Sequence, residues 1–288
     1  MSPLQVNIIL IALGLTPSLV WLYFFSKKDC HPEPKNLVAQ TFLMGVIISP
    51  LAILLQLSFT QLGSMATGFS PAEIQNTSSF FLWAAVVEEI IKLYAIRMLI
   101  MRSPEFDEPI DAMIYMITAG LGFAAMENIL VMFRVFPEGT YATLATWALR
   151  FTGATLLHAL ASGILGYFLA MSWFFQDHSK KLIFIGLIIA TLFHFSFNTF
   201  LSSFGDRLTG LIYSTVLLLV MAFLISVLFA KIKERHRKTI VDVATERERR
   251  PSDERGSTEA SRLNVGSTER SSANVTTVVS NKTINLLK

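Results

Sequence analysis

Long apolar runs separated by short polar segments dominate the chain up to about residue 230. A helix that crosses the hydrocarbon core of a bilayer needs about 20 mostly apolar residues. Seven runs meet this requirement, at residues 4–25, 37–57, 79–101, 111–133, 149–175, 182–204 and 209–230, and the fifth can be extended back to Tyr141. No strand-like alternation stands out between them. The pattern predicts an all-α fold, a polytopic membrane helix bundle of about seven transmembrane helices.

The composition agrees with a surface that faces lipid. Hydrophobic residues make up 52% of the chain, charged residues only 16%, and the mean hydropathy is +0.53. A soluble domain carries roughly a quarter charged residues, so most of this surface has to contact the lipid bilayer. The basic residues lie in short flanks and at the C-terminal end, which gives no sign of nucleic-acid binding. The lone Cys30 excludes an internal disulfide framework and a CxxC metal site.

The positions of lysine and arginine predict the orientation of the chain in the membrane. Positive residues follow the first, third, fifth and seventh runs, whereas the segment 58–78 has none and the later intervening connections contribute Arg134 and Arg207. Cytoplasmic loops carry the excess of positive charge. We therefore expect a multi-pass membrane protein with its N-terminus outside and its C-terminus in the cytoplasm. The first run is expected to be a retained span, because its positive charges follow it instead of preceding it.

The character of the chain changes at about Lys231. Residues 232–288 are rich in Arg, Glu, Ser, Thr and Asn and almost free of aromatic residues. Such a composition cannot bury enough apolar surface to offset chain entropy. We predict a transmembrane domain at residues 1–231 and a disordered cytoplasmic tail at 232–288, whose first turns can form a basic helical extension.

Charged residues interrupt the third run near its midpoint, at Glu88, Glu89 and Lys92. Each charge at the centre of a bilayer costs on the order of 2.5–3.5 kcal/mol. Glu88 and Lys92 are four residues apart and are expected to pair on one helix face, while Glu89 points about 100° away. A structural ion pair is one explanation, but the second carboxylate favours a functional site.

Ionisable and amide side chains also lie inside three later runs. The fourth run contains Glu127, the fifth His158, and the sixth His194 and Asn198. At 1.5 Å per residue these positions and Glu88 lie about 9–15 Å from the outer ends of their helices. Residues at one depth on four helices can line one cavity, so we expect a single polar site.

Two kinds of hydrolytic chemistry fit these residues. Peptide hydrolysis needs an activated water, a stabiliser for the oxyanion and a proton donor for the leaving amine. A buried glutamate can act as the base, and two histidines with a glutamate also form a zinc ligand set. The sequence has no HExxH helix, serine nucleophile motif or paired aspartates of the GxGD type. Glutamate-activated and metal-activated water both stay open, the latter with one divalent metal ion such as zinc.

These residues also carry a family resemblance that spans about residues 79–198. The chain resembles the PrsW family of intramembrane proteases, related to the CAAX prenyl-protease and abortive-infection proteins, in the elements Glu88-Glu89-x-x-Lys92, Phe123-x-x-x-Glu127-Asn128, His158 and His194-x-x-x-Asn198. The resemblance implies cleavage of a membrane-anchored protein, for PrsW an anti-sigma factor, at the extracytoplasmic side of a bacterial inner membrane. It implies that Glu88 and Glu89 activate water and that His194 and Asn198 polarise the scissile carbonyl.

Two positions depart from the pattern of the CAAX branch. Glu127 stands where that branch has a histidine, and Lys92 replaces an arginine that lies one residue further along, so their roles do not transfer directly. A proton- or ion-coupled transporter is the alternative from another class, because buried Glu and His residues also relay protons. The absence of repeated halves in the sequence argues against it.

Overall fold

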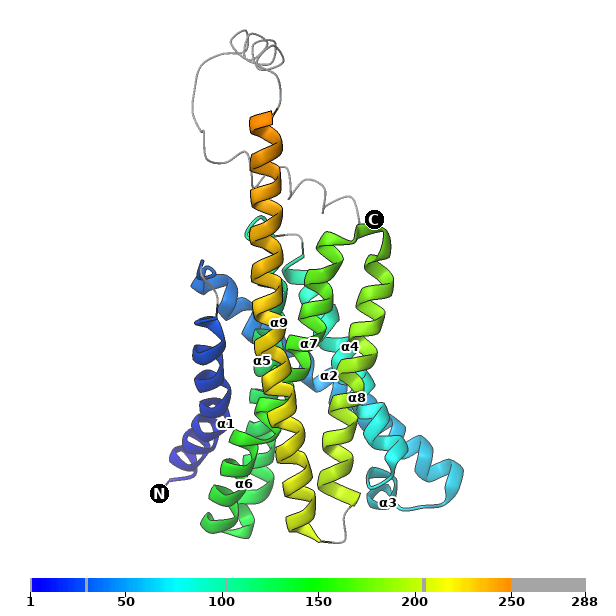
Figure 1. The fold of residues 1–288 in the computed structure, drawn as a ribbon. Coiled ribbons are helices and arrows are strands. Elements are labelled where there is room, and N and C mark those ends of the chain that lie inside the picture. The colour runs from blue at the N-terminus through cyan, green and yellow to red at the C-terminus, as the bar shows by residue number, and fades with distance from the viewer. Residues whose placement is uncertain (1, 29–30, 102, 204–205, 250–288) are drawn as a thin grey trace.

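The computed structural model describes residues 2–28, 31–101, 103–203 and 206–249, and every regular element within these ranges is a helix (Figure 1). The helices are, in chain order, α1 (Pro3–Ser26), α2 (Lys35–Thr67), α3 (Pro71–Gln75), α4 (Ser78–Leu99), α5 (Asp111–Val135), η1 (Phe136–Glu138), α6 (Thr140–Thr152), α7 (Ala154–Phe174), η2 (Gln176–His178), α8 (Ser179–Ser203) and α9 (Arg207–Arg249). The all-α prediction is confirmed.

The centre of the bundle is α5, which is buried along most of its length. It packs against α1, α2 and α7, and α7 in turn packs against α8 and α9. α4 completes the bundle between α2 and α8. The central position of α5 and α7 explains why both carry many small residues, since small side chains let neighbouring helices approach closely.

Six helical segments of the described chain are long and apolar enough to cross a membrane. They contain α1, α2, α5, α6 with α7, α8, and α9. The remaining predicted span corresponds to α4, which is 22 residues long but carries Glu88, Glu89, Lys92 and Arg97. These charges reduce its apolar character, yet α4 lies inside the bundle like the other spans (Figure 1). The chain is therefore a multi-pass membrane protein.

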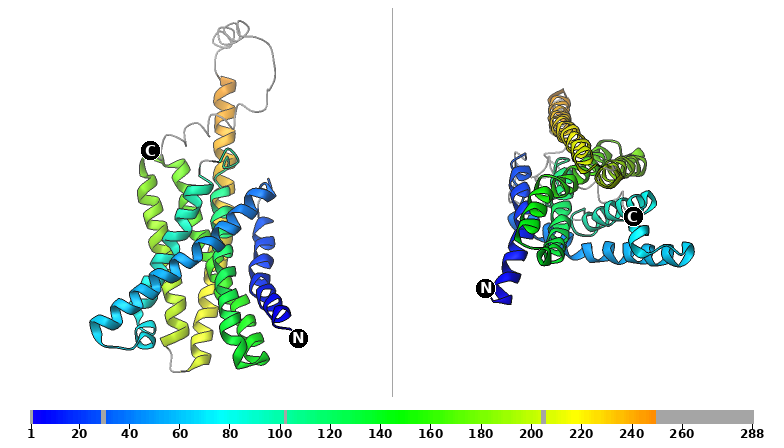
Figure 2. Two further views of the ribbon diagram at one scale, coloured as in Figure 1. Left: turned by 180° about the vertical axis from the view of Figure 1, so that it is seen from behind. Right: turned by 90° about the horizontal axis from the view of Figure 1, so that it is seen from below.

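Glycines fix the crossing of α2 and α5. A Cβ atom placed on Gly122 would lie 2.0 Å from the carbonyl oxygen of Phe42, and one on Gly45 would lie 2.2 Å from that of Ala119. The backbones of the two helices thus touch, which leaves no room for any larger residue. From this crossing α2 runs diagonally away from α5 toward α3 (Figure 2).

The fifth predicted span is two helices. α6 and α7 meet at Gly153, which has φ −103° and ψ −95°, so the segment begins at Thr140 and not at Leu149. The indole N–H of Trp147 donates to the carbonyl of Leu13 at 3.0 Å, and that of Trp21 donates to Phe151 at 2.9 Å. These bonds fasten α6 to α1.

The last helix extends past the predicted domain boundary. α9 continues from the membrane-spanning part to Arg249, because residues after Lys231 are good helix formers and Glu234 pairs with Lys238 one turn later at 2.6 Å. The predicted tail therefore begins within a helix, as the basic extension considered above. Residues 250–288 lie outside the described residues, and disorder there stays a prediction.

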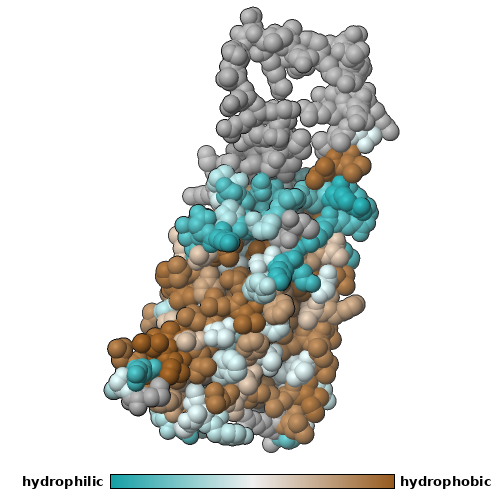
Figure 3. Space-filling view, turned by 90° about the vertical axis from the view of Figure 1, so that its left-hand side faces the viewer, coloured by the Kyte–Doolittle hydropathy of each residue, from teal (hydrophilic) through white to brown (hydrophobic). Residues whose placement is uncertain are grey.

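The two ends of the bundle differ in charge. Figure 3 shows a face covered largely by apolar side chains, bordered by a hydrophilic band at the end where α9 continues. The connections α1–α2, α4–α5 and α7–α8 lie at this same end (Figure 1). Lys27 and Lys28 lie in the first connection, and Lys180 and Lys181 lie in the first turn of α8. This is the end for which the charge pattern predicts a cytoplasmic location.

Candidate active site

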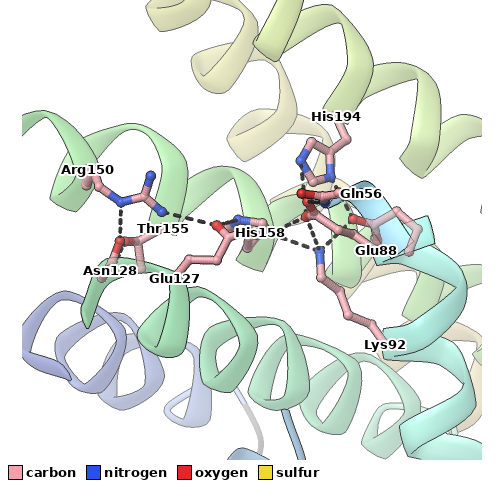
Figure 4. Close-up of polar contacts among 10 residues, drawn as sticks. Gln56, Glu88, Lys92, Glu127, Asn128, Arg150, Thr155, His158 and His194 are labelled. Carbon is pink, nitrogen blue, oxygen red and sulfur yellow. Dashed lines mark hydrogen bonds and ion pairs between the residues drawn. The ribbon is translucent and has the colours of Figure 1, made fainter. Parts of the chain in front are cut away.

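Polar side chains from six helices meet in the interior of the bundle (Figure 4). α4 contributes two glutamates and a lysine, and single residues come from α2, α7 and α8. A further polar group on α5 and α6 adjoins them. The site thus depends on the packing of the whole bundle and on no single motif.

Lys92 and Glu89 form the innermost ion pair. The Nζ atom of Lys92 lies 2.7 Å from Oε1 of Glu89, and the side chains of both residues are fully buried. The distance from Nζ to Oε2 of Glu88 is 3.9 Å. The expected pairing of Lys92 with Glu88 is therefore secondary: the lysine bends toward the residue three positions back, because Glu89 faces the interior between α4 and α8 together with His194.

Glu88 holds one oxygen fixed and leaves the other without a hydrogen bond. Its Oε1 accepts from Nε2 of Gln56 on α2 at 2.9 Å. Its Oε2 is buried and has no hydrogen-bond partner among the described residues. This oxygen lies 3.8 Å from Nδ1 of His158 and 3.6 Å from Nε2 of His194, so it faces both imidazoles.

Each histidine contacts a carboxylate through the ring nitrogen that faces away from Glu88. Nε2 of His158 lies 3.0 Å from Oε2 of Glu127, and Nδ1 of His194 lies 2.9 Å from Oε1 of Glu89. A nitrogen that faces a carboxylate carries the proton, so these contacts assign the lone pair of each ring to the opposite nitrogen. Those opposite nitrogens are the two that face Glu88. The rings are nearly perpendicular, with centroids 5.1 Å apart.

The donor set is one that a divalent metal ion such as zinc can use. One ligand atom each from Glu88, His158 and His194 lies within 4.8 Å of the others. Tetrahedral zinc with bonds of 2.0–2.1 Å places its ligands about 3.3 Å apart, which is close to the two distances from Glu88. Carboxylates on the outer nitrogens of ligating histidines are the usual second layer of such sites. Nδ1 of His158 also accepts from Lys92 at 2.9 Å, so metal binding requires that contact to lengthen.

A second polar group lies at the edge of the site. Nη2 of Arg150, on α6, donates to Oε2 of Glu127 at 3.1 Å, and its Nε donates to Oδ1 of Asn128. The amide of Asn128 donates in turn to Oγ1 of Thr155 at 2.9 Å. Glu127 is thereby linked to α6 and α7 as well as to the centre of the site.

Five of the six residues proposed from the sequence come together: Glu88, Glu89, Glu127, His158 and His194. Asn198 lies one turn beyond His194 on α8, is partly exposed, and makes no side-chain hydrogen bond within the described part of the chain.

Two residues of the site were missed by the sequence analysis. Gln56 stands alone in an apolar stretch, which is a signal that could have been used. Arg150 falls at the uncertain start of the fifth span, where its depth could not be judged.

A family comparison covers most of this architecture. The model of the family described as "PrsW family intramembrane metalloprotease" matches residues 33–228, which include every helix that contributes to the site. The chain belongs to the PrsW family. It is therefore an intramembrane protease, and the resemblance noted in the sequence is confirmed.

Several PrsW proteins from bacteria are similar along most of their length. Protease PrsW of Geobacillus kaustophilus is 29% identical over 186 residues, covering 64% of this chain and 76% of the relative. That of Oceanobacillus iheyensis is 25% identical over 237 residues, covering 81% and 99%. That of Bacillus subtilis is 25% identical over 202 residues, covering 68% and 84%. No solved structure matches the chain.

Proposed function

We propose that this PrsW-family protein cleaves a membrane-anchored protein with water activated at Glu88, His158 and His194, which together hold one zinc ion. The observation that carries the proposal is the buried Oε2 of Glu88, which lacks a hydrogen bond among the described residues and faces two imidazole nitrogens at 3.6 and 3.8 Å. A buried carboxylate oxygen without a donor costs free energy, and a cation between the three groups would offset that cost.

Zinc, when bound, would lower the pKa of a coordinated water and polarise the scissile carbonyl. The protein groups around it have separate tasks. Glu89 and Glu127 orient the imidazoles through the nitrogens that face away from Glu88. Lys92 offsets the charge of Glu89 at 2.7 Å.

Proton transfer is assigned to Glu89 and carbonyl binding to Asn198. The second oxygen of Glu89 is buried and lacks a hydrogen bond among the described residues, so it can accept a proton from the attacking water. The partly exposed amide of Asn198 lies one turn along α8 from His194, and it is proposed to donate to the carbonyl oxygen as charge develops there.

The substrate class follows from the position of the site. A residue inside a helix bundle reaches only a peptide that is itself at or in the membrane. We propose that the substrate is a membrane-anchored protein of the bacterial inner membrane, such as an anti-sigma factor, cleaved at its extracytoplasmic side. The predicted orientation, with the N-terminus outside and α9 ending in the cytoplasm, supports this: together with the depths expected from the sequence, it predicts a site between the mid-plane and the outer surface of the membrane.

The test compares membrane-protein fragments in cells that express the wild type, Glu88→Gln or Glu138→Gln. Glu138 is an exposed glutamate outside the site, so its variant controls for the loss of one carboxylate. Mass spectrometry of new protein termini should reveal fragments of a single-span protein with the wild type and Glu138→Gln only. Fragments that persist with a folded Glu88→Gln protein would refute the role of Glu88.

The same preparations distinguish the two modes of water activation. Purified wild type should contain about one equivalent of zinc. An active preparation without metal would contradict the zinc site, and would assign water activation to Glu88 and Glu89 with His194 and Asn198 as donors to the carbonyl.

A further inference from the structure

Glu127 differs from the other carboxylates of the site in its surroundings. Its side chain is 23% exposed, against 6% for Glu88 and 0% for Glu89. One of its oxygens, Oε2, serves two donors, Nε2 of His158 at 3.0 Å and Nη2 of Arg150 at 3.1 Å. Glu127 thus lies at the edge of the site, on the side of His158 that is opposite Glu88.

Arg150 is held in a fixed geometry by two partners. Its guanidinium reaches Glu127 through Nη2 and Asn128 through Nε, and Asn128 is itself fixed by its hydrogen bond to Thr155. A planar guanidinium with two acceptors aligned on one edge cannot rotate freely. The short helix that carries Arg150 is in turn fastened to α1 through the indole of Trp147.

We propose that Arg150, acting through Glu127, is a positioning residue that keeps His158 with its Nε2–H toward Glu127 and its Nδ1 lone pair toward Glu88. The proposal rests on the function proposed above, since it concerns the same water-activating site. In this arrangement Glu127 orients a ligand and does not itself activate water.

The physical basis is the link between tautomer and hydrogen bonding. The nitrogen of an imidazole that carries the proton is set by the hydrogen bond at that nitrogen. A carboxylate shared with a fixed guanidinium presents its oxygen in one place, so the ring of His158 has one favoured orientation. Without Arg150, Glu127 can adopt other side-chain orientations at the exposed edge of the site, and His158 loses its fixed acceptor.

The experiment uses the full-length protein purified in detergent, with the variants Arg150→Met and Arg150→Lys. Arg134→Met is the matched control, because Arg134 is an exposed arginine on α5 with no place in the site. Zinc affinity is measured by competition with a chelator, and kcat and KM are measured on a cleaved single-span substrate. The tautomer of His158 is read from ¹⁵N chemical shifts in histidine-labelled protein, with His158→Gln to assign the signal.

We expect Arg150→Met to weaken zinc binding about 10–100-fold, the usual effect of losing an outer-layer partner. kcat should fall by a similar factor with KM unchanged, and the ¹⁵N shifts should report mixed tautomers. Arg150→Lys should restore part of the affinity, because the charge beside Glu127 is kept while the second contact to Asn128 is lost. Arg134→Met should match the wild type.

The proposal would be overturned if Arg150→Met kept the zinc affinity of the wild type and a single His158 tautomer. It would also be overturned by a raised KM in that variant, which would assign Arg150 to substrate binding. If Arg150→Met fails to fold, Arg150→Lys decides by the same readouts. A wild type that cleaves without zinc refutes the metal centre alone, and the ¹⁵N tautomer then decides the role of Arg150 independently.

Discussion

The ion pair of Lys92 and Glu89 offers a direct test of whether water reaches the buried charges of the site. Two helical Glu–Lys pairs in the chain have nearly the same length, 2.7 Å for Glu89–Lys92 and 2.6 Å for Glu234–Lys238. The side chains of the first pair are 0% exposed, whereas those of the second are 54% and 67% exposed. Removing the lysine from each pair therefore compares a buried pair with an exposed one.

The expected cost of Lys92→Met follows from the contacts that it breaks. Methionine keeps the apolar stem but removes the ammonium group, whose Nζ lies 4.8 Å from the ring centre of Phe123. Glu89 is left buried with only His194 as a partner, and His158 loses a donor at 2.9 Å. Breaking a buried pair in this way costs about 3–5 kcal/mol, which corresponds to a lowering of Tm by roughly 6–20 °C for a domain of this size class.

Thermal unfolding of the purified variants in detergent measures the effect. Lys238→Met should leave Tm unchanged within error, because an exposed pair is screened by water. The double variant Lys92→Met/Glu89→Gln should recover part of the loss, since the uncompensated charge is gone. The coupling between the two positions should be about 1–3 kcal/mol.

A small change of Tm in Lys92→Met, comparable to that in Lys238→Met, would refute this reasoning. It would mean that water reaches Glu89 and that the site is hydrated despite the burial of its side chains. The substitution would then have to be judged from its effect on cleavage alone.

Three further predictions follow from contacts of the site and of the helix crossing. His194→Ala should reduce bound zinc to well below one equivalent in elemental analysis of folded protein, and an unchanged metal content would contradict its role as a ligand. Gln56→Leu should lower kcat about tenfold, since Glu88 loses a hydrogen bond worth about 1.5 kcal/mol; unaltered cleavage would show that this bond does not position the carboxylate. Gly122→Val should prevent stable folding, because its Cβ would lie 2.0 Å from the carbonyl oxygen of Phe42; a native Tm would show that the α2–α5 crossing can open.

Much of the fold could be predicted because bilayer thickness dictates helix length. The runs at residues 4–25 and 111–133 match α1 and α5 closely. The break at Gly153 was missed because the residues on both sides of it are apolar, and hydropathy does not detect a change of helix direction. The helical continuation of α9 beyond Lys231 was hard to separate from disorder, because charged and polar residues of high helix propensity fit both states.

The site was predictable to the extent that charges in a membrane are costly. That cost drew attention to the charges of the third run, and the further polar residues at a similar depth on three later runs, among them Glu127 and His158, then indicated one common site. Which carboxylate pairs with Lys92 depended on the rotation of α4 against α8, and helical spacing does not report that rotation. Arg150 was not predicted as a site residue for a related reason. A basic residue near a helix end is normally interpreted as lying at the membrane surface, whereas the side chain of Arg150 points inward to Glu127.

The order of the helices along the chain has a consequence for how the protein enters the membrane. α4 is synthesised before α7 and α8, so its two carboxylates and its lysine enter the lipid before either histidine exists. Each charge costs on the order of 2.5–3.5 kcal/mol on insertion. Among the described partners of the two carboxylates, Lys92 and the amide of Gln56 on α2 precede α7 and α8 in the chain. We therefore expect the Gln56 contact from α2 to stabilise α4 during insertion: a nascent chain that lacks it should hold α4 in the bilayer poorly until α7 and α8 have been inserted.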